Sequence, residues 1–65
     1  MNRLLKLKTV IEITGVSRSH IYALAQKGLF PKPVKLTERS SAWVEAEVLA
    51  WIDTRIAARD LECAA

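Results

Sequence analysis

The sequence has little of what several common classes of protein require. Its single cysteine, Cys63, excludes an internal disulfide and a cysteine-rich zinc site. No apolar run approaches the roughly 18 residues of a membrane-spanning helix. Residues 1–6 contain no apolar stretch long enough for a signal peptide. We therefore expect a cytoplasmic protein with no membrane partner.

Catalysis and metal binding also lack the residues they require. The 65 residues allow one small domain with no room for an enclosed active site of ordinary size. A catalytic site requires a nucleophile, a base and an orienting group within reach, and His20 and Cys63 are the only residues of their kinds. One histidine and one cysteine are too few for a structural zinc site without several carboxylates. We predict no enzyme activity, no metal and no cofactor.

Positive charge is concentrated ahead of the C-terminal segment. Residues 17–44 carry five cationic side chains and one acidic side chain, a balance of +4, whereas residues 45–65 have a balance of −3. A basic region of this kind indicates a polyanionic partner, although a solvated surface with chance asymmetry would look the same.

The first helix is expected at about residues 9–14. Thr9 and Glu12 have the spacing of a capping box, with Thr9 as N-cap. Gly15 is a plausible residue to end the helix.

A second helix is expected at about residues 18–27. Ser17 is its candidate N-cap, and Gly28 suits the position after its end, with Lys27 in the last turn. Its apolar positions share one face, and they are Ile21, Leu24 and Ala25.

Two short helices joined by a turn with Gly15 and Val16 are typical of a helix-turn-helix. A generic helical hairpin that only builds a core is the alternative. Arg18, Ser19 and Tyr22 favour the helix-turn-helix, because they project away from the apolar face at the start of the second helix. A recognition helix presents such residues to base edges in the major groove.

A basic extended segment follows the second helix. Pro31 and Pro33 hold it extended, and alternation over residues 34–36 predicts an edge strand. Residues 37–40 can turn, and residues 42–44 can return as a second strand. Lys35 and Arg39 would then contact DNA, or would only discourage aggregation at a strand edge.

A third helix is expected at about residues 45–59, with residues 60–65 as a flexible tail. Its apolar stripe comprises Val48, Leu49, Trp51, Ile52 and Ile56. Trp43 and Trp51 suit base stacking, but a core position is the stronger interpretation, because large aromatic residues dominate burial in small domains.

The chain resembles the AlpA-type phage and prophage regulators over about residues 3–56. The resemblance lies in "TGVSRS" at 14–19 with Ile21 and Tyr22, "GLFPKPV" at 28–34, and Trp43, Glu47, Val48, Trp51 and Ile52. It implies a winged helix-turn-helix related to MerR-like and excisionase-like DNA-binding domains, mainly α with a small β-hairpin, over residues 1–59. The family often has glycine at the wing turn, whereas this chain reads "LTERSSAW", which predicts a wider loop.

The residues and the resemblance together predict a sequence-specific transcription regulator that binds double-stranded DNA in the nucleoid. An excisionase that acts with an integrase is the alternative, and a small protein-binding adaptor is a third. RNA polymerase is a further candidate partner, and self-association on repeated DNA sites is a further candidate property. The predicted DNA-binding residues are Ser17, Arg18, Ser19, His20, Tyr22, Lys27, Lys32, Lys35, Arg39 and Ser40.

Overall fold

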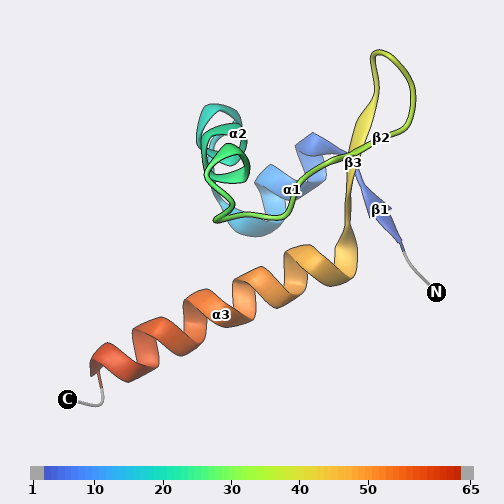
Figure 1. Ribbon diagram of the computed structural model, residues 1–65. Coiled ribbons are helices and arrows are strands. Elements are labelled where there is room, and N and C mark those ends of the chain that lie inside the picture. Colours follow the sequence, from blue (N-terminus) through green and yellow to red (C-terminus); the bar gives the residue numbers. More distant parts are fainter. Residues whose placement is uncertain (1–2, 64–65) are drawn as a thin grey trace.

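The computed structural model describes residues 3–63. It is mainly helical with a small antiparallel sheet, as predicted (Figure 1). The elements follow one another as β1 (Leu4–Leu5), α1 (Leu7–Thr14), α2 (Arg18–Gln26), β2 (Val34–Lys35), β3 (Ser41–Val44) and α3 (Glu45–Cys63).

The predicted hairpin of β2 and β3 is present. The sheet, however, has three strands in the order β1-β3-β2, one more than the sequence predicted. The sequence analysis missed β1, which pairs antiparallel with β3 through Leu4 opposite Val44 and Leu5 opposite Trp43. A strand of two residues carries no readable alternation, and only its pairing with β3 defines it. The addition of β1 leaves β2 as an edge strand, as its sequence predicted.

The predicted capping box at the start of α1 is wrong. α1 begins at Leu7, two residues before Thr9, and its N-cap is Lys6, which gives no side-chain cap. Thr9 and Glu12 therefore both lie inside the helix. The chain enters α1 directly from β1, and this tertiary constraint overrides the local capping signal.

The turn between α1 and α2 forms as predicted. Gly15 takes a left-handed conformation with φ of 73°, and its N–H donates to the Ile11 carbonyl. The Thr14 hydroxyl donates to the Val10 carbonyl at 2.7 Å and accepts from the Val16 N–H at 3.2 Å. Val16 then packs half-buried against the core.

Both predicted ends of α2 are confirmed to within one residue. The Ser17 hydroxyl accepts from the His20 N–H at 3.4 Å, which caps the N-terminus. At the other end Lys27 is the C-cap and Gly28 has φ of 76°. The Leu29 N–H donates to the Leu24 carbonyl and the Gly28 N–H to the Ala25 carbonyl, which is a Schellman motif.

The core collects one or two residues from nearly every element. Ile21 and Ala25 of the predicted apolar face are buried, and Leu24 packs against the core half-buried. Trp43 is fully buried, which confirms its core position. The buried cluster comprises Leu5, Val10, Ile21, Ala25, Phe30, Trp43 and Val48.

Two indoles hold the loop between α2 and β2. Trp43 Nε1 donates to the Pro31 carbonyl at 3.0 Å, and Trp51 Nε1 donates to the Leu29 carbonyl at 2.7 Å. Phe30, between these two carbonyls, packs edge-on against Trp51 with ring centroids 4.8 Å apart. Trp51 itself is half-buried at the edge of the core.

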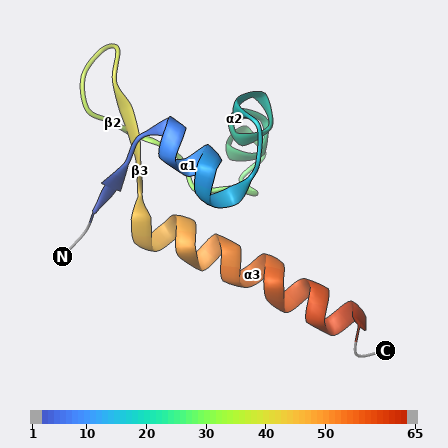
Figure 2. The ribbon, with the colours of Figure 1, turned by 180° about the vertical axis from the view of Figure 1, so that it is seen from behind.

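α3 is longer and more exposed than its sequence predicted. It continues to Cys63, so residues 60–63 are helical where a tail was expected, while residues 64–65 lie outside the described part. Leu49 and Ile56 of the predicted apolar stripe are 46% and 42% exposed. The helix runs out past the rest of the domain, so little lies against its C-terminal half (Figures 1 and 2). Within residues 3–63 no helix is long and apolar enough to cross a membrane.

Candidate nucleic-acid interface

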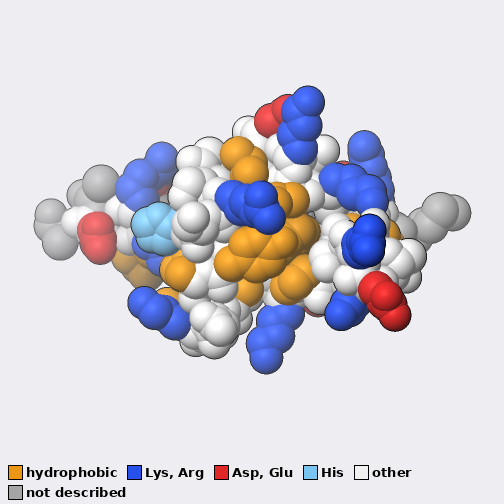
Figure 3. Space-filling view, turned by 90° about the horizontal axis from the view of Figure 1, so that it is seen from above, with side chains coloured by type: hydrophobic (Ala, Val, Ile, Leu, Met, Phe, Trp, Pro, Cys, Tyr) orange, Lys and Arg blue, Asp and Glu red, His pale blue; other side chains and the backbone are white. Residues whose placement is uncertain are grey.

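One face of the molecule carries both α2 and the turn between β2 and β3. In two opposite views α2 and this turn lie on the side away from α3 (Figures 1 and 2). Seen from that side, Lys and Arg side chains surround a hydrophobic patch, and acidic side chains are few (Figure 3). The predicted recognition helix and the predicted wing therefore open onto the same basic face.

The outer surface of α2 carries most of the predicted contact residues. Arg18, Ser19, His20 and Tyr22 are all exposed, whereas Ile21 among them is buried. Ser17 is also exposed, but its hydroxyl is already engaged in the cap. Lys27 is exposed at the C-cap, at the far end of the helix.

Sequence reasoning missed Gln26 on this surface. Gln26 is exposed in the last turn of α2 and shares a face with Ser19 and Tyr22, which lie seven and four residues earlier. The spacing of these three residues is legible in the sequence, and it could have identified Gln26. A glutamine amide pairs with adenine through two hydrogen bonds.

The turn of the hairpin is wide and contains no glycine. It closes through the Leu36 N–H, which donates to the Ser40 carbonyl at 2.8 Å, and the Arg39 N–H, which donates to the Thr37 hydroxyl at 3.3 Å. Among the described residues only the two glycines have positive φ, so the turn avoids the left-handed region. This confirms the wider loop. Arg39 is exposed on the loop, and Lys35 is exposed at the end of β2 just before it.

A hollow of about 380 Å³, here called the cationic hollow, separates α2 from the hairpin turn. It brings together four of the predicted residues, Arg18, Tyr22, Arg39 and Ser40. Its remaining lining residues are Lys6, Leu7, Lys8, Ser41 and Trp43.

Lys6 and Lys8 are the cations of this hollow that sequence reasoning missed. Both are exposed, at the N-cap and in the first turn of α1. Residues 1–16 carry Arg3, Lys6 and Lys8 against Glu12, a balance of +2, but nothing local places these lysines beside α2 and the hairpin. Only the packing of α1 between these elements does so.

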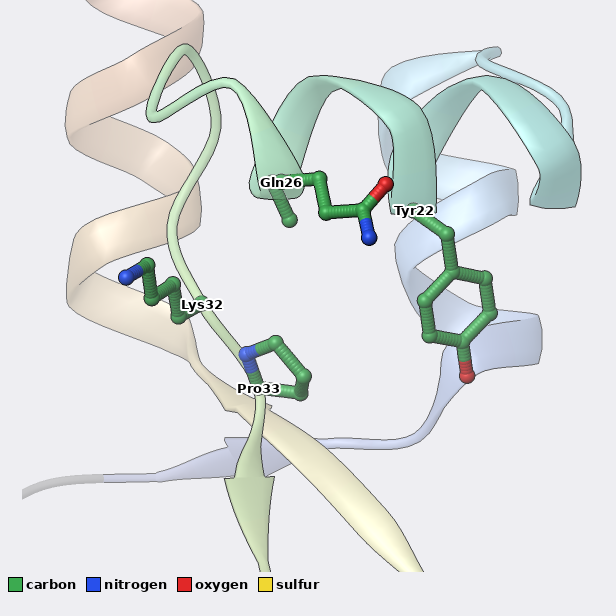
Figure 4. Close-up of a pocket in the computed structure, with 5 residues that line it drawn as sticks. Tyr22, Gln26, Lys32 and Pro33 are labelled. Carbon is green, nitrogen blue, oxygen red and sulfur yellow. The ribbon is translucent and has the colours of Figure 1, made fainter.

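A second hollow of about 370 Å³ lies between α2 and the extended segment before β2. Tyr22 and Gln26 extend from α2 toward this segment, and the ring of Pro33 faces them, whereas the Lys32 ammonium points away (Figure 4). Lys32 therefore borders this hollow without directing its charge into it. Lys27 and Lys35 line neither of the two hollows.

The cations of this face have no acidic partners in the described part of the chain. The ion pairs of residues 3–63 are Arg3 with Glu45 at 3.4 Å and Arg59 with Asp60 at 2.9 Å. Neither pair includes a predicted contact residue. The positive charge on the face is thus available to an external anion.

The α1–α2 pair with its glycine turn, followed by the β2–β3 hairpin, defines a winged helix-turn-helix. The family described as "Prophage CP4-57 regulatory protein (AlpA)" matches residues 3–56. The chain therefore belongs to the AlpA family, whose description is that of a regulatory protein.

Two curated relatives are similar over most of the chain. The uncharacterized protein ORF88 of Enterobacteria phage P4 is 46% identical over 88% of this chain, and the chain spans 65% of that relative's length. The DNA-binding transcriptional activator AlpA of Escherichia coli K12 is 36% identical over 82% of this chain and 84% of its own length.

Proposed function

We propose that this chain is a phage-type regulator of transcription that binds specific sequences in duplex DNA. The observation that carries the proposal is the shared basic face of α2 and the hairpin turn. Family membership and the name of the Escherichia coli relative support it.

In the proposed complex α2 lies in the major groove and reads base edges. Arg18 is the first residue of α2 and is exposed, and a guanidinium forms two hydrogen bonds with guanine O6 and N7. Ser19 and Gln26 lie on the same outer surface, where a hydroxyl or an amide can donate and accept. These side chains supply sequence preference.

The hairpin turn supplies affinity that does not depend on sequence. Lys35 and Arg39 are exposed, and long cationic side chains bind phosphate oxygens wherever the backbone passes. The wing holds the domain on the duplex while α2 tests the bases. Substitutions in α2 and in the hairpin should therefore have different effects on sequence preference.

The salt dependence of binding tests the proposal. If four to six phosphates are neutralised, a plot of log K against log salt has a slope of roughly −4 to −5. Fluorescence anisotropy with labelled duplexes from the DNA flanking the gene measures the slope, and footprinting on the same DNA locates the site. A flat salt dependence, or no binding at low salt, refutes DNA binding. Equal affinity for all duplexes refutes sequence specificity alone.

A further inference from the structure

The cationic hollow collects positive charge from three separate parts of the chain. Lys6 and Lys8 come from the start of α1, Arg18 from the start of α2, and Arg39 from the hairpin turn. No acidic side chain lines the hollow among the described residues, and none of the four cations forms an ion pair there. Like charges that converge on one concave surface repel one another unless an anion lies between them.

Neutral hydrogen-bond donors line the same hollow. Tyr22, Ser40 and Ser41 are among its lining residues, and each carries a hydroxyl group. They suit the ester and sugar oxygens of a nucleotide strand, which accept hydrogen bonds without needing a full charge. The hollow thus offers both charge and neutral donors.

The start of α1 adds backbone donors that no side chain occupies. Its N-cap makes no side-chain hydrogen bond, and its first turn has no acidic residue. The first N–H groups of a helix have no partner within the helix and favour an anion. Lys6, Leu7 and Lys8, which begin α1, all line the hollow. α2 differs, because the Ser17 hydroxyl caps it.

We propose that the cationic hollow binds the sugar-phosphate strand that separates the groove read by α2 from the groove beside the wing, with Lys6 and Lys8 clamping one phosphodiester. The inference rests on the proposed DNA-binding function and extends it to α1. With α2 in one groove and the hairpin beside the next, the strand between the grooves passes over the surface between these elements, which is the hollow. Lys6 and Lys8 then fix the register of the domain on the duplex.

The test uses Lys6→Gln, Lys8→Gln and the double variant, which remove charge from exposed side chains and leave the core intact. Arg55→Gln is the matched control, because Arg55 is an exposed cation of α3 that does not line the cationic hollow. We expect the double variant to reduce the magnitude of the salt slope by roughly one unit, the value of one phosphate, and each single variant to reduce it by less. All three variants should weaken cognate and scrambled duplexes alike. The control keeps the slope of the unmodified protein.

A scan of the duplex with single neutral methylphosphonates locates the phosphate. With the unmodified protein, one substitution between the two grooves weakens binding, and with the double variant the same substitution has little further effect, because the interacting partners are already gone. The inference is overturned if methylphosphonate substitution weakens the unmodified protein and the double variant equally at every position. It is also overturned if the double variant keeps the salt slope of the unmodified protein while Arg18→Ala loses affinity. Both results leave DNA binding by α2 intact.

Inorganic phosphate distinguishes the DNA strand from a free anion. Nuclear magnetic resonance titration of the unmodified protein with phosphate alone follows the backbone amides of residues 6–8. Weak shifts that appear only at high phosphate concentration support a site that needs the whole strand. Tight saturation by free phosphate, with duplex affinity unaffected by the lysine variants, assigns the hollow to a small anion and overturns the inference. An unmodified protein that binds no duplex refutes both this inference and the proposed function.

Discussion

Tyr22 of α2 packs edge-on against Trp43 of β3, with ring centroids 5.9 Å apart and ring planes at 63°. Trp43 is fully buried, whereas Tyr22 is 42% exposed on the outer surface of the helix. The pair joins the helix that is proposed to read bases to β3, the central strand of the sheet. It therefore sets the spacing between α2 and the wing, and Tyr22 lines the hollows on both of its sides.

Tyr22→Ala is expected to lower the free energy of unfolding by at least about 0.5–1.5 kcal/mol, because it removes the aromatic pair and also the area that the ring buries. Tyr22→Phe keeps the ring and should unfold like the unmodified protein. Urea denaturation followed by circular dichroism measures both. If the phenylalanine variant is destabilised as much as the alanine variant, the hydroxyl and not the ring contact holds α2.

The two tryptophans are expected to differ in their contributions to stability. Trp43→Ala should cost about 3–5 kcal/mol, since its side chain is fully buried and donates to Pro31. A loss of that size approaches the whole stability of a small domain. Trp51→Ala should cost about 1–3 kcal/mol, because its indole is only half-buried. Thermal unfolding followed by far-ultraviolet circular dichroism ranks them, and the reverse order contradicts this assignment.

Gly28→Ala is expected to destabilise the end of α2 by about 1–2 kcal/mol, the cost of a left-handed conformation for a residue with Cβ. Gly28 has φ of 76°, and an added Cβ meets no atom within 4 Å, so the cost is conformational and not steric. Gly28→Asn should cost less, because asparagine tolerates this region better. Urea denaturation of the two variants compares them, and equal stability of all three proteins would exclude a strained αL position.

Substitutions in α2 and in the wing are expected to weaken DNA binding in different ways. Arg18→Ala and Gln26→Ala should weaken the cognate site by about 1–3 kcal/mol and have a much smaller effect on scrambled DNA. Lys35→Ala should weaken all sequences nearly alike and reduce the salt slope by roughly one unit. Competition binding with cognate and scrambled duplexes separates the effects. If Lys35→Ala alone changes sequence preference, the wing reads the bases and α2 only supports it.

Local chemistry in the sequence was sufficient for the ends of α2 and the turn before it. Ser17 caps the N-terminus of α2, and Gly28 ends the helix at its C-terminus. Each residue forms its contacts with near neighbours in the sequence, so both ends could be predicted. Gly15 acts in the same way after α1. The hairpin was also legible, because Pro31 and Pro33 hold the chain extended and residues 34–36 alternate in the sequence, although only Val34 and Lys35 form β2.

Contacts between distant residues decided the rest. β1 exists only because Leu5 pairs with Trp43, and the chain that leaves this strand begins α1 at Leu7 instead of after Thr9. Leu49 and Ile56 have helical spacing, but no other element covers them, so they are exposed. Lys6 and Lys8 look like ordinary solvated charges until β1 and α1 bring them beside Arg18 and Arg39. Capping and turn formation depend on a few adjacent residues, whereas convergence of charge depends on the packing of the whole chain.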